Sequence, residues 1–238
     1  MKNNTSSTQK AAQRILAKTT LNELRTSGHP LGRPLALCLM FESIENQLMA
    51  ASLFDLAIAL DAALHIPSDS LLAAIRIQWW ADAVTSTANQ KVPLVTCLQS
   101  QYCMRDDLLP QLQELISEWQ AACHDKNRDS SAGWAAAWQL VAIHLGQSTA
   151  ANQAAIIGRG LNYAACEQGY DRRAGNVDID YLRQNGRSWL YLSACLYRTL
   201  QRDKNLNLKP AQIKHQMKLD DPGLVWRILS WHIFGPPR

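Results

Sequence analysis

The residues of this chain best suited to chemistry include a pair of carboxylates, Glu167 and Asp171, which are four positions apart. In a continuous helix that spacing places both acids on one face. Carboxylate oxygens are ligands that Mg²⁺ prefers, and protein-bound Mg²⁺ commonly bridges to substrate phosphates. Arg172 and Arg173 follow directly and could contact a diphosphate. The pattern is compatible with a weak Mg²⁺ or diphosphate site, but we favour a frayed helix end whose arginines complement the helix dipole.

A second group lies in residues 75–84, where Trp79 and Trp80 are adjacent and Arg76 precedes them. At a helical period, Arg76, Trp80 and Val84 share one stripe, and Trp79 belongs to the neighbouring one. The two indoles could line a cavity for a lipid, although core packing is the simpler expectation. Arg76 could bind a diphosphate, but we favour a structural ion pair with a carboxylate of a neighbouring helix. We expect the helix to be central, with at least one of the two tryptophans mostly buried.

The elements that carry these residues are predicted to be helices throughout. Apolar residues recur at helical spacing, and no alternating Val, Ile or Thr runs indicate strands. A polar N-terminal segment with a first helix (1–25) and one helical domain (26–238) are therefore expected, in an all-α class. The predicted helices span residues 11–25, 35–41, 46–65, 71–86, 92–102, 108–124, 132–145, 150–169, 188–202 and 224–234.

Composition limits the function classes. The chain has 238 residues, 47% of them hydrophobic and 18% charged, with a net charge of +4. Such a chain can form a large core, and the absence of a dense Lys/Arg run argues against nucleic acid as a partner. Its six cysteines show no C-x-x-C spacing, which favours reduced buried thiols over a zinc site or disulfides.

Several stretches together resemble the squalene/phytoene synthase family. The most specific is Ile-Arg-Ile-Gln-Trp-Trp-Ala-Asp-Ala-Val at 75–84, which is similar to the family's Trp-pair signature. Weaker similarities follow in the family's order at 33–41, 51–61, 134–146, 157–164 and 188–200. The resemblance implies a single helical domain of the trans-isoprenyl diphosphate synthase type. It also implies condensation of two prenyl diphosphates, with Mg²⁺ held by two facing carboxylate clusters.

The carboxylates that the resemblance requires are incomplete. Only Asp61 lies where the first cluster is expected. A Mg²⁺ site there would need a second carboxylate beside it, but the positions that should supply one include Ala59 and His65. The remaining candidates, Glu167 and Asp171, would correspond to the second cluster. We therefore expect no tight Mg²⁺ site at Asp61, and no cofactor unless the chain is catalytic, in which case it needs Mg²⁺.

Two functions stay open. The first is a non-catalytic relative that binds an isoprenoid or lipid, similar to the family branch that assembles respiratory complex I and therefore meets a membrane-protein partner. The second is an active Mg²⁺-dependent head-to-head prenyltransferase. The expected location is the cytoplasm or the mitochondrial matrix, with peripheral contact to the inner membrane. Residues 1–20 are compatible with a transit segment or with a polar tail.

The C-terminal helix carries an apolar stripe of Leu224, Ile228, Trp231 and Phe234. This stripe either packs on the core, which we favour, or anchors the protein at a membrane interface.

Overall fold

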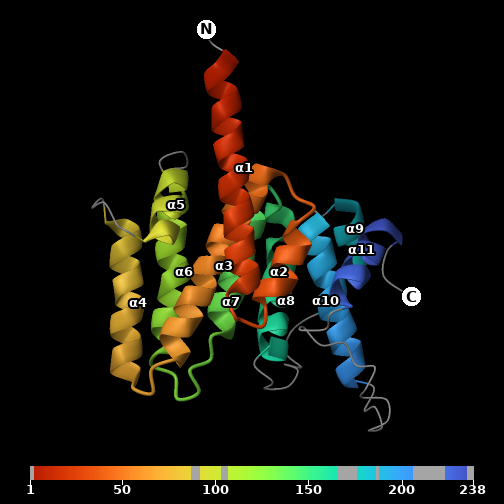
Figure 1. Cartoon of the computed structure of the whole chain (residues 1–238). Helices are drawn as coiled ribbons and strands as arrows, with labels where there is room; N and C mark the ends of the chain where they lie inside the picture. Colours follow the sequence, from red (N-terminus) through yellow and green to blue (C-terminus); the bar gives the residue numbers. More distant parts are fainter. Residues whose placement is uncertain are drawn as a thin grey trace. The chain divides into compact units, whose positions relative to one another are not determined.

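The structure is a computed structural model, and it describes residues 3–86, 92–102, 107–165, 176–185, 188–205 and 223–234. Every regular element in these ranges is a helix (Figure 1). The all-α class expected from the sequence is therefore confirmed, whereas the specific isoprenyl synthase-type fold stays a prediction.

The chain forms two compact units. Unit 1 combines both ends of the chain, Met1–Ala51 and Tyr163–Arg238, and unit 2 is the continuous stretch Ser52–Asn162. The boundaries fall inside helices α3 (Ile44–His65) and α8 (Ala151–Ala165).

Unit 1 is built around α2 (Gly32–Leu39), which packs against α1 (Asn3–Thr26), α10 (Ser188–Asn205) and α11 (Leu224–Phe234). Nearly every residue of α2 is buried, because its neighbours surround this short apolar helix. A Cβ at Gly32 would collide with the Leu24 carbonyl oxygen of α1, so glycine permits the close approach. The buried carboxylate of Glu42 accepts a hydrogen bond from the Trp189 backbone N–H at the start of α10 (3.3 Å).

The α11 stripe packs on the core as favoured from the sequence. Leu224, Ile228 and Trp231 are buried, whereas Phe234 is exposed. The ring of Phe41 stacks on His232 at a centroid distance of 4.0 Å. Three of the four stripe positions therefore pack α11 against its neighbours within unit 1.

Unit 2 contains the second part of α3, with α4 (Ser70–Thr85), α5 (Pro93–Tyr102), α6 (Leu108–Ala122), α7 (Ser131–His144), the 3₁₀ turn η1 (Ser148–Ala150) and most of α8. Its core is aromatic. Phe54 meets Trp138 edge-on at 5.2 Å between ring centroids, and Trp119 meets Trp134 at 6.2 Å. These large rings fill the space between α3, α6 and α7.

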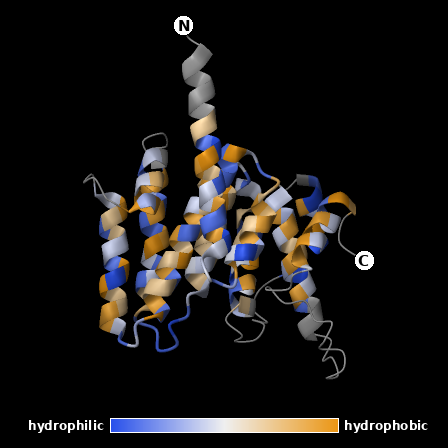
Figure 2. Cartoon of the chain, viewed as in Figure 1, coloured by the Kyte–Doolittle hydropathy of each residue, from blue (hydrophilic) through white to orange (hydrophobic). Residues whose placement is uncertain are grey.

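Helix α4 lies at the edge of unit 2, so the expectation of a central helix is wrong (Figure 1). Its buried residues are Ala73, Ile77, Ala83 and Val84. Trp80 shares the stripe of Ala73, Ile77 and Val84 and is partly buried, while Trp79 is 46% exposed. Apolar residues occur on several faces of this helix, so periodicity alone did not identify the face that turns inward. Figure 2 shows strongly hydrophobic residues at its N-terminal end, the lower end in that view.

Most predicted helix positions agree with the structure to within a few residues at the ends. Helix α1 begins at Asn3, eight residues before the predicted start, and the last four residues of the helix predicted over 150–169 lie outside the described residues. One helix was not predicted. Helix α9 (Ile179–Asn185) lies in a region expected to be coil because it is rich in Asn, Asp and Gly. It is short, and Asp178 starts it by accepting a hydrogen bond from the Tyr181 N–H (2.9 Å). The sequence analysis thus took Asp178, which caps the start of this helix, as part of a loop.

Among the described residues, α3 is the one helix long and apolar enough to cross a membrane by length and composition. Of its most apolar stretch, 72% is buried inside the protein. The same test is passed by core helices, and the burial of α3 on most sides accounts for its apolar composition.

Candidate binding pocket between α3 and α4

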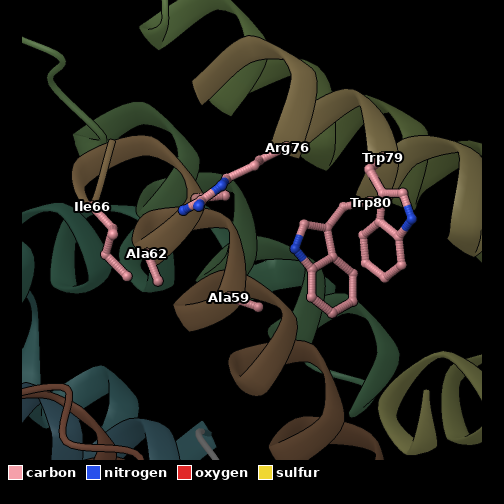
Figure 3. A pocket seen from close by; sticks show the side chains of 7 residues that line it. Ala59, Ala62, Ile66, Arg76, Trp79 and Trp80 are labelled. Atoms are coloured by element: carbon pink, nitrogen blue, oxygen red, sulfur yellow. The ribbon is translucent and has the colours of Figure 1, made fainter. Parts of the chain in front are cut away.

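A pocket of about 340 Å³ lies in unit 2 between the C-terminal half of α3 and the outer helix α4 (Figure 3). Its volume is within the range of small-molecule sites, near the lower end. The lining residues are Ala59, Ala62, Ala63, Ile66, Arg76, Trp79 and Trp80.

Helix α3 forms the floor of this pocket. Ala59, Ala62 and Ala63 recur at three- and four-residue spacing, so they lie on one helix face. Their small side chains leave space that larger residues would fill. Ile66, just after the helix, is 72% exposed and closes one end. The α3 face thus supplies an apolar surface without a polar side chain.

Helix α4 forms the opposite wall with larger side chains. The Trp80 ring points down toward Ala59, and Trp79 packs edge-on against it at 5.0 Å between centroids (Figure 3). The Arg76 side chain extends over α3 toward Ala62 and Ile66, at the other end of the pocket. Arg76 and the tryptophan pair, which the sequence analysis grouped on one helix, therefore line the same pocket.

Arg128 holds the loop that joins the two pocket helices. It follows α6 and has a positive φ of 47°, which is uncommon for a residue with a Cβ. Its guanidinium donates hydrogen bonds to three carbonyl groups, those of Leu64 (3.3 Å), Pro67 and Ser68 (2.7 Å). These bonds cap the end of α3 and fix the segment that carries Ile66. The sequence analysis missed Arg128, because the contact spans about 60 positions.

The carboxylate of Asp61 takes part in core packing and is not among the pocket-lining groups. It is 7% exposed, and its Oδ1 accepts a hydrogen bond from the Trp134 indole N–H (3.1 Å). The same oxygen lies 3.6 Å from Nε2 of His65, one helical turn away. Asp61 therefore satisfies a buried donor of α7, which is a structural role.

The other predicted site residues, Glu167, Asp171, Arg172 and Arg173, lie outside the described residues. Within the described ranges, no group of three His, Cys, Asp or Glu side chains is arranged to hold a metal ion. The lining of the α3–α4 pocket likewise offers no carboxylate among its described residues. The described donor set around this pocket does not fit Mg²⁺, which prefers oxygen ligands and especially carboxylates.

Next to the pocket, polar side chains join α4 to α6. Gln78 donates to Asp82 Oδ1 (2.9 Å) and accepts from Gln120 of α6 (2.9 Å). Asp82, which follows the tryptophan pair in the sequence, is thus engaged with Gln78 along its own helix. This polar contact and the buried stripe hold α4 in place while Trp79 stays exposed.

Comparison with family models, with curated proteins and with solved structures finds no match to this chain.

Proposed function

We propose that this chain is a non-catalytic, squalene/phytoene synthase-like protein that binds an isoprenoid or another lipid in the α3–α4 pocket. The observation that carries the proposal is the composition of that pocket. Two indoles, three alanines and an isoleucine surround it, and one arginine lies at its end. Such a lining suits an apolar chain with a polar end.

The position of Asp61 supports the non-catalytic part of the proposal. Ionisation of an allylic diphosphate needs metal ions to neutralise the leaving group, and those ions need carboxylates. Asp61 is committed to Trp134 and lies beside His65 in the core of unit 2. A two-headed condensation would require acids that the described pocket does not supply.

The physiological setting proposed with it is the assembly of respiratory complex I at the inner mitochondrial membrane, or at the corresponding membrane of a bacterium. This setting follows from the family resemblance. In it, the bound lipid would accompany contact with a membrane-protein partner.

The test is incubation of the purified chain with farnesyl or geranylgeranyl diphosphate and Mg²⁺, followed by extraction of hydrocarbons and, in parallel, by calorimetry of binding. We expect no hydrocarbon product, and binding of the prenyl chain that Mg²⁺ does not strengthen. Replacing Trp80 by Ala should weaken binding, whereas the same change at the exposed Trp226 of α11 should not. Formation of a C30 or C40 hydrocarbon would support the active prenyltransferase instead.

A further inference from the structure

Arg76 is the one charged residue among the seven described residues that line the α3–α4 pocket. The described part of the chain places no acid within ion-pair distance of its guanidinium and no hydrogen-bond acceptor on it. This finding differs from the sequence expectation, which favoured a structural ion pair. A guanidinium group beside an apolar surface can bind carboxylate or phosphate oxygens through its N–H donors.

The end of α3 would be the natural partner of a cation at this position, because helix C-termini carry partial negative charge. Arg128 already occupies that role, since it bonds the carbonyl groups of Leu64, Pro67 and Ser68. Arg76 reaches the same end of the pocket from the opposite helix (Figure 3). The capping by Arg128 thus leaves the Arg76 guanidinium available to a ligand.

Trp80 offers a second donor. Its indole nitrogen is on the side of the ring that turns toward Arg76 (Figure 3). An indole N–H donates only, so it favours an acceptor in the space between the two side chains. The ring faces of Trp80 and Trp79 and the alanines of α3 continue from this point as apolar surface.

We infer that the pocket binds the anionic head of a single-chain amphiphile, a carboxylate or a phosphate monoester, directly through Arg76 and the Trp80 N–H and without a metal ion. This inference rests on the proposed function and specifies its ligand. One guanidinium and one indole N–H match a small head of low charge. A diphosphate that arrives with Mg²⁺ would need carboxylates opposite it, which the described lining lacks.

The experiment compares three ligands with one chain and different heads: farnesyl monophosphate, farnesoate and farnesol. Binding to the full chain is measured by calorimetry below micelle-forming concentrations, once with EDTA and once with Mg²⁺. We expect both anions to bind about tenfold to a hundredfold more tightly than farnesol, as expected for a charge-assisted contact. Exchange of EDTA for Mg²⁺ should change their affinities less than about twofold. The better of the two anions then identifies phosphate or carboxylate as the natural head.

Three variants test which side chains bind the anionic head. Arg76→Gln should reduce the affinity of both anions to that of farnesol. Lys126→Gln removes an equal charge from an exposed position outside the pocket and should change nothing. Trp80→Phe keeps a ring but removes the donor, so it should weaken the anions severalfold and leave farnesol unaffected.

The outcomes that overturn the inference differ from those that overturn the proposed function. Equal binding of the anions and farnesol removes the anion site and leaves lipid binding intact. Anion binding that disappears in EDTA shows a metal-dependent site. Full anion affinity in Arg76→Gln also overturns it, because the head then binds elsewhere. If none of the three ligands binds, the inference and the proposed function both fail.

Discussion

Two glycines of unit 2 lie against tryptophan rings, and their lack of a side chain decides whether the helices can approach. A Cβ at Gly133 of α7 would lie 2.6 Å from the Trp119 ring, and one at Gly158 of α8 would collide with Trp138. Helical glycine ordinarily costs about 1 kcal/mol relative to alanine. At these two positions the steric clash that a Cβ would make with the ring outweighs that cost.

We therefore predict that Gly158→Ala destabilises the protein by about 1–3 kcal/mol, as overpacking of a filled core does. The free energy of unfolding is measured by urea denaturation. Combining it with Trp138→Phe should recover part of the loss, because a smaller ring leaves room for the methyl group. A gain in stability from Gly158→Ala alone would show that helix propensity governs this position.

A second prediction concerns Asp61. Its replacement by Ala removes the acceptor of the buried Trp134 N–H and should cost about 1–3 kcal/mol of unfolding free energy. Asp61→Asn keeps an oxygen at this place and should cost less. Both variants should bind pocket ligands as the wild type does. Mg²⁺-dependent diphosphate binding that is lost on Asp61→Ala would instead give this carboxylate a role in metal binding.

At the scale of elements, the interface of α2 and α10 buries two thiols. Burial raises the pKa of Cys38 to about 12, an effect partly offset by a hydrogen bond from Ser193. Burial likewise raises the pKa of Cys195 to about 11, and nearby Tyr191 and arginines lower it slightly. Both values exceed the ordinary 9.0 of a thiol. Between about pH 9 and pH 11, the two thiols therefore keep their protons in the folded state and lose them in the unfolded chain.

We predict that stability falls as pH rises above about 9. Below this pH both thiols are protonated in the folded and the unfolded state, so their contribution to the free energy of unfolding is fully present. Between about 9 and 11 each thiol should remove on the order of 1 kcal/mol per pH unit, because unfolding releases its proton. Urea midpoints at pH 8, 9, 10 and 10.5 measure the slope. A Cys38→Ala, Cys195→Ala double variant should show a flatter slope, and an unchanged slope would assign the effect to other groups.

Several features of these elements could be predicted from sequence and others could not. The α11 residues Leu224, Ile228 and Trp231 repeat at helical spacing, so their common burial followed from periodicity. The spacing of Arg76 and Trp80 placed them on one helix face, but the alanines of α3 that complete the pocket opposite them were not predicted. The Arg128 contact could not be foreseen, because its acceptors are backbone carbonyl groups that carry no sequence signal.

At the scale of the whole molecule, the two units use the chain differently. Unit 2 is one continuous segment with its own tryptophan core, whereas unit 1 needs both ends. We predict that a fragment of residues 52–162 folds by itself. Circular dichroism should show helix and a cooperative thermal transition. A non-cooperative melt would mean that unit 2 depends on unit 1.

A complementary chain that ends at Gly223 tests unit 1. It loses the buried Leu224, Ile228 and Trp231 of α11, which pack against α2 and α10. Hydrogen exchange should then show lost protection in α2 and α10 but retained protection in α6 and α7. Equal loss in all four helices would contradict independent units.

The split of unit 1 has a consequence for synthesis on the ribosome. Helix α2 emerges early, yet α10 begins at Ser188, roughly 150 residues later. At ordinary translation rates this interval is on the order of 10–30 s. During it the part of α2 that α10 and α11 cover in the finished molecule lacks these two partners, while α1 is already made and unit 2 can already fold. The nascent chain should therefore be most prone to aggregate after unit 2 is complete and before α10 has left the exit tunnel.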